Sequence, residues 1–128
     1  MTKREIAVEY KHSGLNCCQA VLAVYSQELG IDMETVKKIG AAFAAGMGCA
    51  QANCGALIGA QIVLGLLKYE NKGMHAEASA LYNEFKKLSG STICKELKGI
   101  ETGKVLCSCE DCVRNAVTAL ESVVGEIY

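Results

Sequence analysis

The eight cysteines are the residues of this 128-residue chain whose type and spacing could do chemistry. Four of them lie in or near the first turn of a predicted helix: Cys17, Cys54, Cys94 and Cys112. At a helix start, free backbone N–H groups and the positive end of the helix dipole stabilise an anion. They lower the pKa of a thiol and leave hydrogen-bond donors for its sulfur. We therefore expect these four thiols to converge on one redox or metal site.

Cys18 and Cys49 are expected to differ from these four. Cys18 is next to Cys17, and neighbouring side chains on a helix point about 100° apart. We therefore expect Cys18 to be a small buried hydrophobic residue outside the site. Cys49 lies five residues before Cys54 in a glycine-rich loop, so it could reach the same centre as an additional metal ligand.

Cys107, Cys109 and Cys112 form the densest local metal-ligand pattern in the chain, C-x-C-x-x-C. Thiolate clusters of this kind suit Zn²⁺, Fe–S clusters or Cu(I), and the spacing does not choose among them. Cys107 and Cys109 are therefore further candidate ligands, and whether they share a centre with Cys17 stays open. A haem attachment site would need His where Val113 stands.

Motifs that would indicate a hydrolase or a nucleic-acid binder are missing from the sequence. It has no P-loop, no G-x-G-x-x-G and no H-E-x-x-H motif, and its two histidines form no hydrolase pattern. Lys and Arg number 13 against 14 Asp and Glu, which gives a formal net charge of −1. A dedicated nucleic-acid binder usually carries a basic surplus, so we expect no nucleic-acid partner.

The termini and the apolar segments predict a cytoplasmic protein without a membrane span. The first residues lack the apolar region of a secretory signal, which favours a reducing compartment where cysteines serve metal or redox chemistry. Residues 39–67 carry no formal charge and are long enough to cross a bilayer. Glycines, Gln51, Asn53 and Gln61 interrupt this stretch, so we expect a helix buried in a protein core.

The elements that must position these thiols are predicted to be helices. Apolar residues make up 51% of the chain, proline and tryptophan are absent, and the apolar periodicity is helical nearly throughout. We expect an all-α fold, a compact bundle of five or six short helices that forms one domain over residues 1–128. The expected helices cover about residues 2–12, 17–29, 33–45, 54–70, 74–89 and 109–127, with a short turn around Cys94.

Local signals set the expected ends of these helices. Asn16, Asp32 and Asn53 are predicted N-caps, and Gly30 and Gly90 are predicted to end the helices before them. Residues 46–53 are predicted to form a loop. Two helices have a marked apolar face, formed in the 33–45 helix by Val36, Ile39, Ala42 and Phe43 and in the last helix by residues from Val113 to Ile127.

Gly55 and Gly59 belong to a stripe of small residues on the central helix. Small residues let another backbone approach closely. We interpret the stripe mainly as tight packing inside the bundle. A close homodimer contact, or room for an inorganic cofactor, are the alternatives.

Four motifs occur in an order that resembles a known family. They are N-C-C-Q-A-V at 16–21, C-G-A-L-I-G at 54–59, I-C-K-E-L at 93–97 and D-C-V at 111–113. In this order they resemble the C_GCAxxG_C_C family of redox-active proteins, over most of the chain from about Gly14. The resemblance places the family's four cysteines at Cys17, Cys54, Cys94 and Cys112. Cys18 stands where the family is expected to have alanine.

The resemblance implies a limited set of functional expectations. The family is described as redox-active by inference, and its similarity to the non-haem part of split-Soret cytochromes points towards an Fe–S cluster. It further implies an unidentified redox partner protein and a role accessory to an oxidoreductase.

Three functions are consistent with the residues. The first is electron transfer by an Fe–S cluster on Cys17, Cys54, Cys94 and Cys112, where helix N-termini would suit an anionic centre. The second is a zinc- or soft-metal-binding helical module, favoured by the cluster at 107–112. The third is a metal-free dithiol/disulfide redox protein, favoured by low thiol pKa values at helix starts.

Overall fold

Helices form nearly all regular structure in the computed structural model, which describes residues 1–127, without the side chains of 126 and 127. Six helices of eight or more residues occur in this part of the chain: α1 (Lys3–His12), α2 (Cys17–Val24), α4 (Met33–Gly40), α6 (Gly55–Lys68), α7 (His75–Ser89) and α9 (Cys109–Ile127). The shorter elements are α3 (Ser26–Leu29), η1 (Ala41–Phe43), α5 (Ala44–Met47) and α8 (Cys94–Lys98). The all-α prediction is confirmed.

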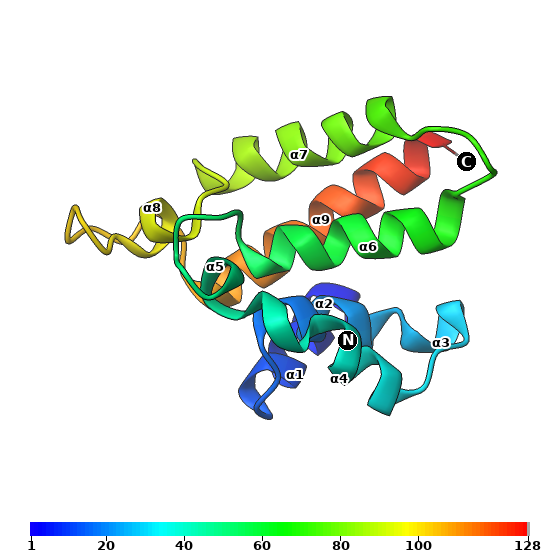
Figure 1. Ribbon diagram of the computed structural model, residues 1–128, viewed down its shortest axis with the longest axis horizontal. Helices are drawn as coiled ribbons and strands as arrows, with labels where there is room; N and C mark the ends of the chain where they lie inside the picture. Colours follow the sequence, from blue (N-terminus) through cyan, green and yellow to red (C-terminus); the bar gives the residue numbers. More distant parts are fainter. Residues whose placement is uncertain (128) are drawn as a thin grey trace.

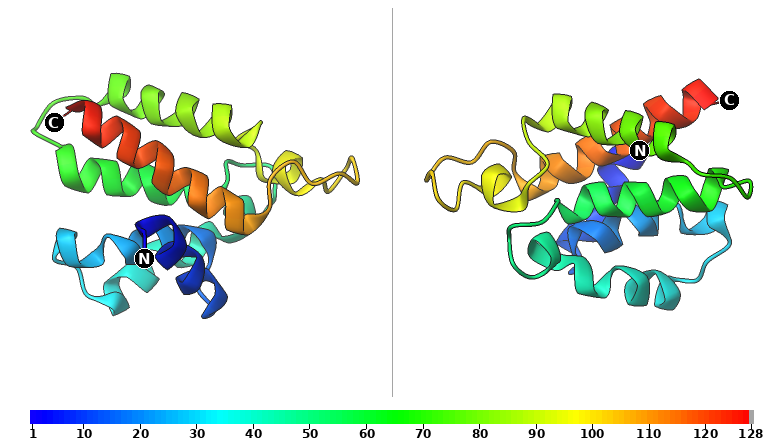
Figure 2. Two further views of the ribbon diagram at one scale, coloured as in Figure 1. Left: turned by 180° about the vertical axis from the view of Figure 1, so that it is seen from behind. Right: turned by 45° about the horizontal axis from the view of Figure 1, so that its top comes forward.

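The helices form two layers, as Figure 1 and Figure 2 show. The long helices α6, α7 and α9 lie side by side, and α1, α2 and α4 cover them from one side. The core between the helices is apolar, with Leu22, Leu57, Phe85 and Leu120 almost completely buried. At one end of the molecule, α5 and α8 lie next to each other among irregular segments.

The closest contact between the layers joins α2 to α6, and we call it the α2–α6 seam (Cys18, Val21, Gly55 and Gly59). A Cβ atom on Gly59 would lie 2.8 Å from the carbonyl oxygen of Cys18 and 3.2 Å from Cβ of Val21. A Cβ atom on Gly55 would lie 2.9 Å from the carbonyl oxygen of Phe43. The small-residue stripe therefore faces another helix of the same chain.

Several predicted helix ends are present. The Asn16 side chain accepts a hydrogen bond from the Gln19 backbone N–H, and the Gln19 side chain accepts one from the Asn16 N–H, which forms a capping box. The Asp32 carboxylate accepts from the Thr35 N–H at 2.7 Å. Gly30 ends the segment that starts at residue 17, although a turn at Tyr25 divides this segment into α2 and α3.

The predicted helix over residues 33–45 was too long. It ends at Gly40, because side chains of the capping box take its last carbonyl groups: Asn16 donates to Gly40 O at 3.0 Å and Gln19 donates to Lys37 O at 2.8 Å. The chain then turns through η1, which leaves Ala42 exposed rather than inward. The helical periodicity of the apolar residues could not indicate this tertiary contact.

Asn53 is not the cap of α6, contrary to the prediction. It pairs with Ile93 in an isolated antiparallel bridge, and the Cys54 N–H donates to Thr92 O at 2.8 Å. Cys54 itself is the residue at the N-cap. A pairing with a segment about forty residues later in the chain replaced the local cap.

The apolar stripe of α9 faces the core, with Val113, Val117 and Leu120 completely buried. The side chain of Ile127, predicted to continue the stripe, lies outside the described residues. No helix in residues 1–127 combines the length and the apolar character that crossing a membrane requires.

Candidate thiol site

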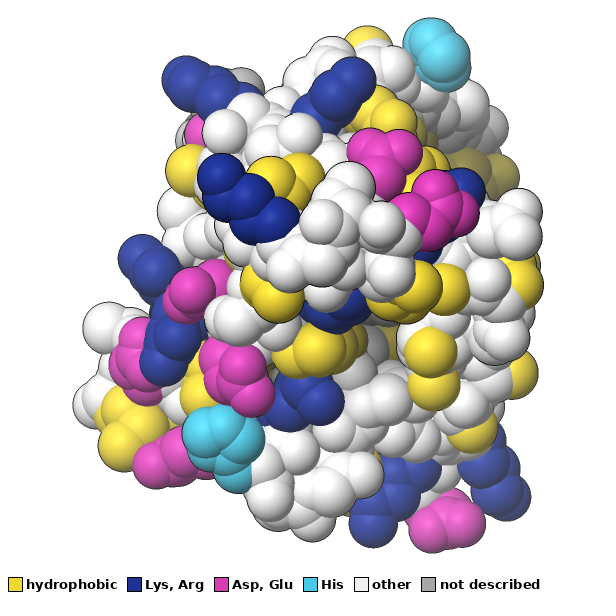
Figure 3. All heavy atoms as spheres, turned by 90° about the vertical axis from the view of Figure 1, so that its left-hand side faces the viewer, with side chains coloured by type: hydrophobic (Ala, Val, Ile, Leu, Met, Phe, Trp, Pro, Cys, Tyr) yellow, Lys and Arg dark blue, Asp and Glu magenta, His cyan; other side chains and the backbone are white. Residues whose placement is uncertain are grey.

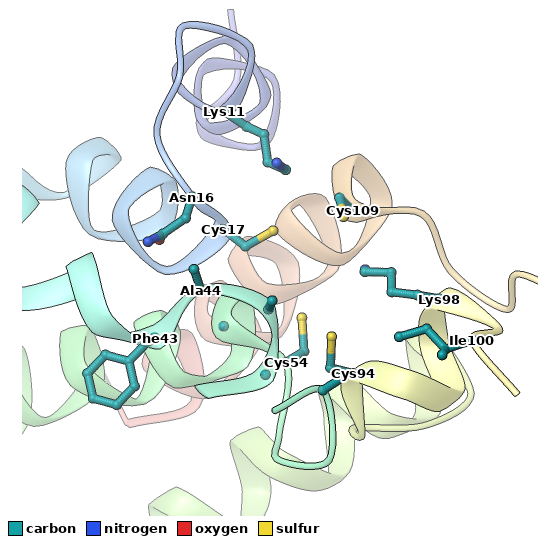
Figure 4. A pocket seen from close by; sticks show the side chains of 14 residues that line it. Lys11, Asn16, Cys17, Phe43, Ala44, Cys54, Cys94, Lys98, Ile100 and Cys109 are labelled. Atoms are coloured by element: carbon teal, nitrogen blue, oxygen red, sulfur yellow. The ribbon is translucent and has the colours of Figure 1, made fainter. Parts of the chain in front are cut away.

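A cavity of about 350 Å³ opens at the end of the molecule that carries α5 and α8. Four thiols line it, from Cys17, Cys54, Cys94 and Cys109, and we call it the thiol cavity. Figure 4 shows these side chains, together with Lys11 and Lys98, around one space. Figure 3 shows the same end from outside, where hydrophobic and basic side chains surround a hollow.

Each of the four thiols belongs to the start of a different helix. Cys17, Cys94 and Cys109 are the first residues of α2, α8 and α9, and Cys54 occupies the N-cap of α6. Four helix N-termini therefore contribute the wall of a single cavity. Their backbone N–H groups and dipoles favour negative charge there.

The capping interactions explain why the helices begin at these cysteines. The capping box at Asn16 starts α2, and the Ser108 side chain accepts from the Asp111 N–H at the start of α9. The bridge between Asn53 and Ile93 brings the starts of α6 and α8 together, with the Cys94 N–H donating to Ala52 O at 3.0 Å. Cysteines far apart in sequence are thereby held at fixed positions.

Cys17 and Cys109 interact as one pair of thiols. A hydrogen bond from Cys17 lowers the pKa of Cys109 to about 5, with help from the charges of Lys98 and Lys11 and against the effect of burial. The same hydrogen bond, together with burial, raises the pKa of Cys17. Cys109 is therefore the thiolate and Cys17 the donor at neutral pH.

Cys54 and Cys112 form a second pair. A hydrogen bond from Cys112, the backbone N–H groups of Ala56 and Leu57 and the charge of Lys98 lower the pKa of Cys54 to about 6, against burial. The shared hydrogen bond and burial raise the pKa of Cys112. Cys112 is completely buried and lies behind Cys54 rather than in the cavity wall.

Cys94 lines the cavity outside both pairs. Burial raises its pKa, the neighbouring Cys54 adds to the effect, and Lys98 opposes it. Figure 4 shows the Cys94 and Cys54 sulfur atoms pointing into the same space. Cys94 is thus a protonated thiol beside a thiolate.

The three other cysteines lie elsewhere. Cys18 is completely buried in the α2–α6 seam, and burial raises its pKa to about 12. Cys49 is exposed, and its thiol donates to Gly46 O at 3.4 Å. Cys107 accepts a hydrogen bond from the Asn115 side chain at 3.6 Å and does not line the cavity. The C-x-C-x-x-C thiols therefore have three different surroundings.

Lys98 is a site residue that the sequence analysis missed. Its ammonium group donates to Cys112 Sγ at 3.4 Å and hydrogen-bonds to Cys109. Burial disfavours its charge, but the Cys112 and Cys54 thiols outweigh burial and raise its pKa. One signal could have found it, because Lys98 follows Cys94 by four residues and shares its face of the helix.

The backbone of residues 44–50 forms one side of the cavity in an unusual conformation. Ala45, Gly46, Met47 and Ala50 all have positive φ angles, between 51° and 63°. A Cβ atom on Gly46 would lie 2.6 Å from Cβ of Cys94. The Lys95 N–H donates to Ala50 O at 2.8 Å and ties this loop to α8. Strained backbone of this kind is concentrated at functional sites.

The donor set fits a thiolate-bound anionic group. Among the side chains described, no three Cys, His, Asp or Glu residues are arranged to hold a single metal ion. The cavity instead presents several thiols, helix N-termini and two ammonium groups around one space. This set of donors is compatible with a thiolate-bound metal cofactor.

A comparison with protein families points to redox activity. The model of the family described as "Putative redox-active protein (C_GCAxxG_C_C)" matches residues 15–123. The chain belongs to the C_GCAxxG_C_C family. No curated protein and no solved structure matches it.

In this C_GCAxxG_C_C protein, only three of the four cysteines that the family motifs mark lie in the cavity wall. Cys17, Cys54 and Cys94 line the thiol cavity, and Cys112 contacts it only through Cys54 and Lys98. Cys109, which the resemblance left out, supplies the fourth thiol of the wall. The first turn of α9 thus carries two candidates, Cys109 and Cys112, for the fourth cysteine of the site.

Proposed function

We propose that this protein is an electron-transfer protein whose thiol cavity holds an Fe–S cluster. The observation that carries the proposal is the convergence of four helix-starting cysteines on one cavity beside two lysines. Cys17, Cys54 and Cys94 would be ligands, with Cys109 as the fourth from the wall or Cys112 from behind it. When bound, such a cluster supplies one-electron redox chemistry.

The chain's own residues have defined tasks in this proposal. The thiolates of Cys54 and Cys109 bind, and the helix N-termini and Lys98 stabilise the negative charge that collects around them. Phe43, Ala44 and Ile100 add carbon atoms to the wall and limit the access of water. Burial and hydrogen bonds to sulfur are among the features that set the potential of such a centre.

Purification without oxygen, followed by iron, sulfide and zinc analysis and a visible spectrum, tests the proposal. We expect iron with matching sulfide, and loss of both in Cys54→Ser. Cys107→Ser is the matched control, because Cys107 is equally a cysteine of the 107–112 cluster but lies outside the cavity. A folded anaerobic protein without iron would contradict the proposal, and stoichiometric zinc would favour a zinc module.

Cys109→Ser and Cys112→Ser then identify the fourth ligand. The variant that replaces the fourth ligand should lose iron and colour. The variant that replaces the other cysteine should keep both, with a changed spectrum. If both variants retained as much iron as the wild type, a four-thiolate site in this cavity would be contradicted.

Dithiol/disulfide exchange is a second candidate, favoured by the two thiol pairs. In each pair a thiolate lies beside a protonated thiol, as in Cys109 with Cys17. The thiolate would attack a disulfide of a partner protein, and the second thiol would release the partner as its dithiol, leaving a disulfide here. A glutathione redox titration of metal-free protein with mass spectrometry should yield Cys17–Cys109 or Cys54–Cys112 disulfides, and their absence would count against this function.

A further inference from the structure

Lys98 lies between the two thiol pairs. Its ammonium group donates to Cys112 Sγ at 3.4 Å on one side and hydrogen-bonds to the Cys109 thiolate on the other. Its charge also acts on Cys54 and Cys17, so every thiol of both pairs is within its influence. Figure 4 shows the side chain extending from α8 into the cavity.

The partners of Lys98 set it apart from the other lysine of α8. Lys95 forms an ion pair with Glu101 at 3.1 Å. Lys98 is half-buried, and within residues 1–127 its recorded partners are sulfur atoms rather than carboxylates. Its positive charge is therefore available to the thiol site instead of being neutralised by an acid.

We propose that Lys98 is the positioning residue that sets the reduction potential of the thiol site. A fixed positive charge stabilises the form of a redox centre that carries more negative charge, which is the reduced form. The proposal rests on the proposed redox function but does not depend on which group is reduced. A reduced cluster carries more negative charge than its oxidised form, and a reduced thiol pair with one thiolate carries more than the neutral disulfide.

Three variants test the role of this charge. Lys98→Met removes the ammonium group and keeps a chain of similar length, Lys98→Arg keeps the charge, and Lys95→Met removes a charge from the outer face of the same helix. Lys98→Gln is a second neutral variant, in case the methionine variant fails to fold. Circular dichroism verifies the fold of each.

A dithionite titration of the iron-loaded protein is the first measurement. In Lys98→Met we expect the equilibrium constant for reduction to fall about tenfold, which lowers a one-electron midpoint potential by about 59 mV. Lys98→Arg should restore the wild-type midpoint, and Lys95→Met should not change it. A Lys98→Met midpoint equal to wild type would overturn the proposal.

Alkylation of the metal-free, reduced protein by iodoacetamide is the second measurement, and it does not need a cluster. Without the ammonium group, the pH midpoint of alkylation at Cys109 and Cys54 should rise by about one unit. If no preparation contains iron, the cluster proposal fails while this measurement still decides the role of Lys98. An unchanged alkylation profile in the neutral variants would overturn the proposal for Lys98, with or without a cluster.

Discussion

Cys17 and Cys18 are neighbours in the chain, yet they belong to two regions with opposite physical character. Cys18 lies in the α2–α6 seam, where regular helices approach so closely that a single added carbon atom would collide with backbone. Cys17 lies in the thiol cavity, where the wall includes left-handed backbone, thiols and ammonium groups. The seam is filled by apolar atoms, and the cavity leaves space for a ligand.

The difference shows how the fold can build a reactive site. The seam holds α2 against α6, and both helices begin at cysteines of the cavity. Close packing of the helix bodies therefore fixes the positions of Cys17 and Cys54 at their ends. Changes in the seam should act on stability first, and changes in the cavity should act on thiol chemistry first.

The largest effect on stability is expected for Gly59→Ala in the seam. The new Cβ atom would lie 2.8 Å from Cys18 O, and helix backbone moves apart only with loss of packing. Overpacking of this kind costs about 1–3 kcal/mol, which urea unfolding measures. Gly65→Ala on the same helix is the control, because its Cβ meets nothing within 4 Å and should stabilise the helix by up to about 1 kcal/mol. Equal stability of the two variants would contradict the close packing of α2 against α6 at Gly59.

Gly46→Ala should combine a loss of stability with a direct effect on the thiol site. The positive φ angle costs alanine about 1 kcal/mol, and the new Cβ atom would lie 2.6 Å from Cβ of Cys94. Gly48→Ala is the control, because it has a positive φ angle but no atom within 4 Å. We expect iodoacetamide to react with Cys94 at a changed rate only in Gly46→Ala. Identical Cys94 rates in both variants would show that Gly46 does not hold this thiol.

The pH dependence of alkylation should separate the two regions without any mutation. The thiolates of Cys109 and Cys54 have pKa values of about 5 and 6, so their alkylation should persist at neutral pH and be lost as the pH falls through these values. Burial raises the pKa of Cys18 to about 12, so this seam thiol should stay unreactive throughout that range. Each pH unit below a pKa corresponds to a tenfold loss of rate, or about 1.4 kcal/mol. Mass spectrometry of quenched samples measures the extent of alkylation at each cysteine. Alkylation of Cys18 in the same pH range as Cys109 and Cys54 would contradict the difference between the seam and the cavity.

The smallest expected effect on stability distinguishes the adjacent cysteines themselves. Cys18→Ala removes one completely buried heavy atom and should cost about 0.5–1.5 kcal/mol, comparable to Ile→Val in a core. Cys17→Ala removes a sulfur that faces the cavity and should cost less in urea unfolding. It should nevertheless raise the pKa of Cys109, which loses its hydrogen-bond donor. A larger stability loss for Cys17→Ala than for Cys18→Ala would reverse the assignment of the two regions.

Features controlled by neighbouring residues were predictable. The capping box at Asn16 joins residues three apart, and the apolar stripe of α9 follows from one period of the helix. The early end of α4 and the pairing of Asn53 were not predictable, because each depends on a hydrogen bond to a distant segment. Gly40 O, for example, accepts from Asn16, which precedes it by 24 residues.

The sequence by itself determined that cysteines stand at helix starts, where backbone N–H groups and the helix dipole favour thiolates. Only the tertiary structure decided which thiols meet, placing Cys109 in the cavity wall and Cys112 behind it. It also decided that Lys98 lies between the two pairs. Helix starts depend on residues a few positions apart, whereas the convergence of four starts depends on how whole helices pack across the seam.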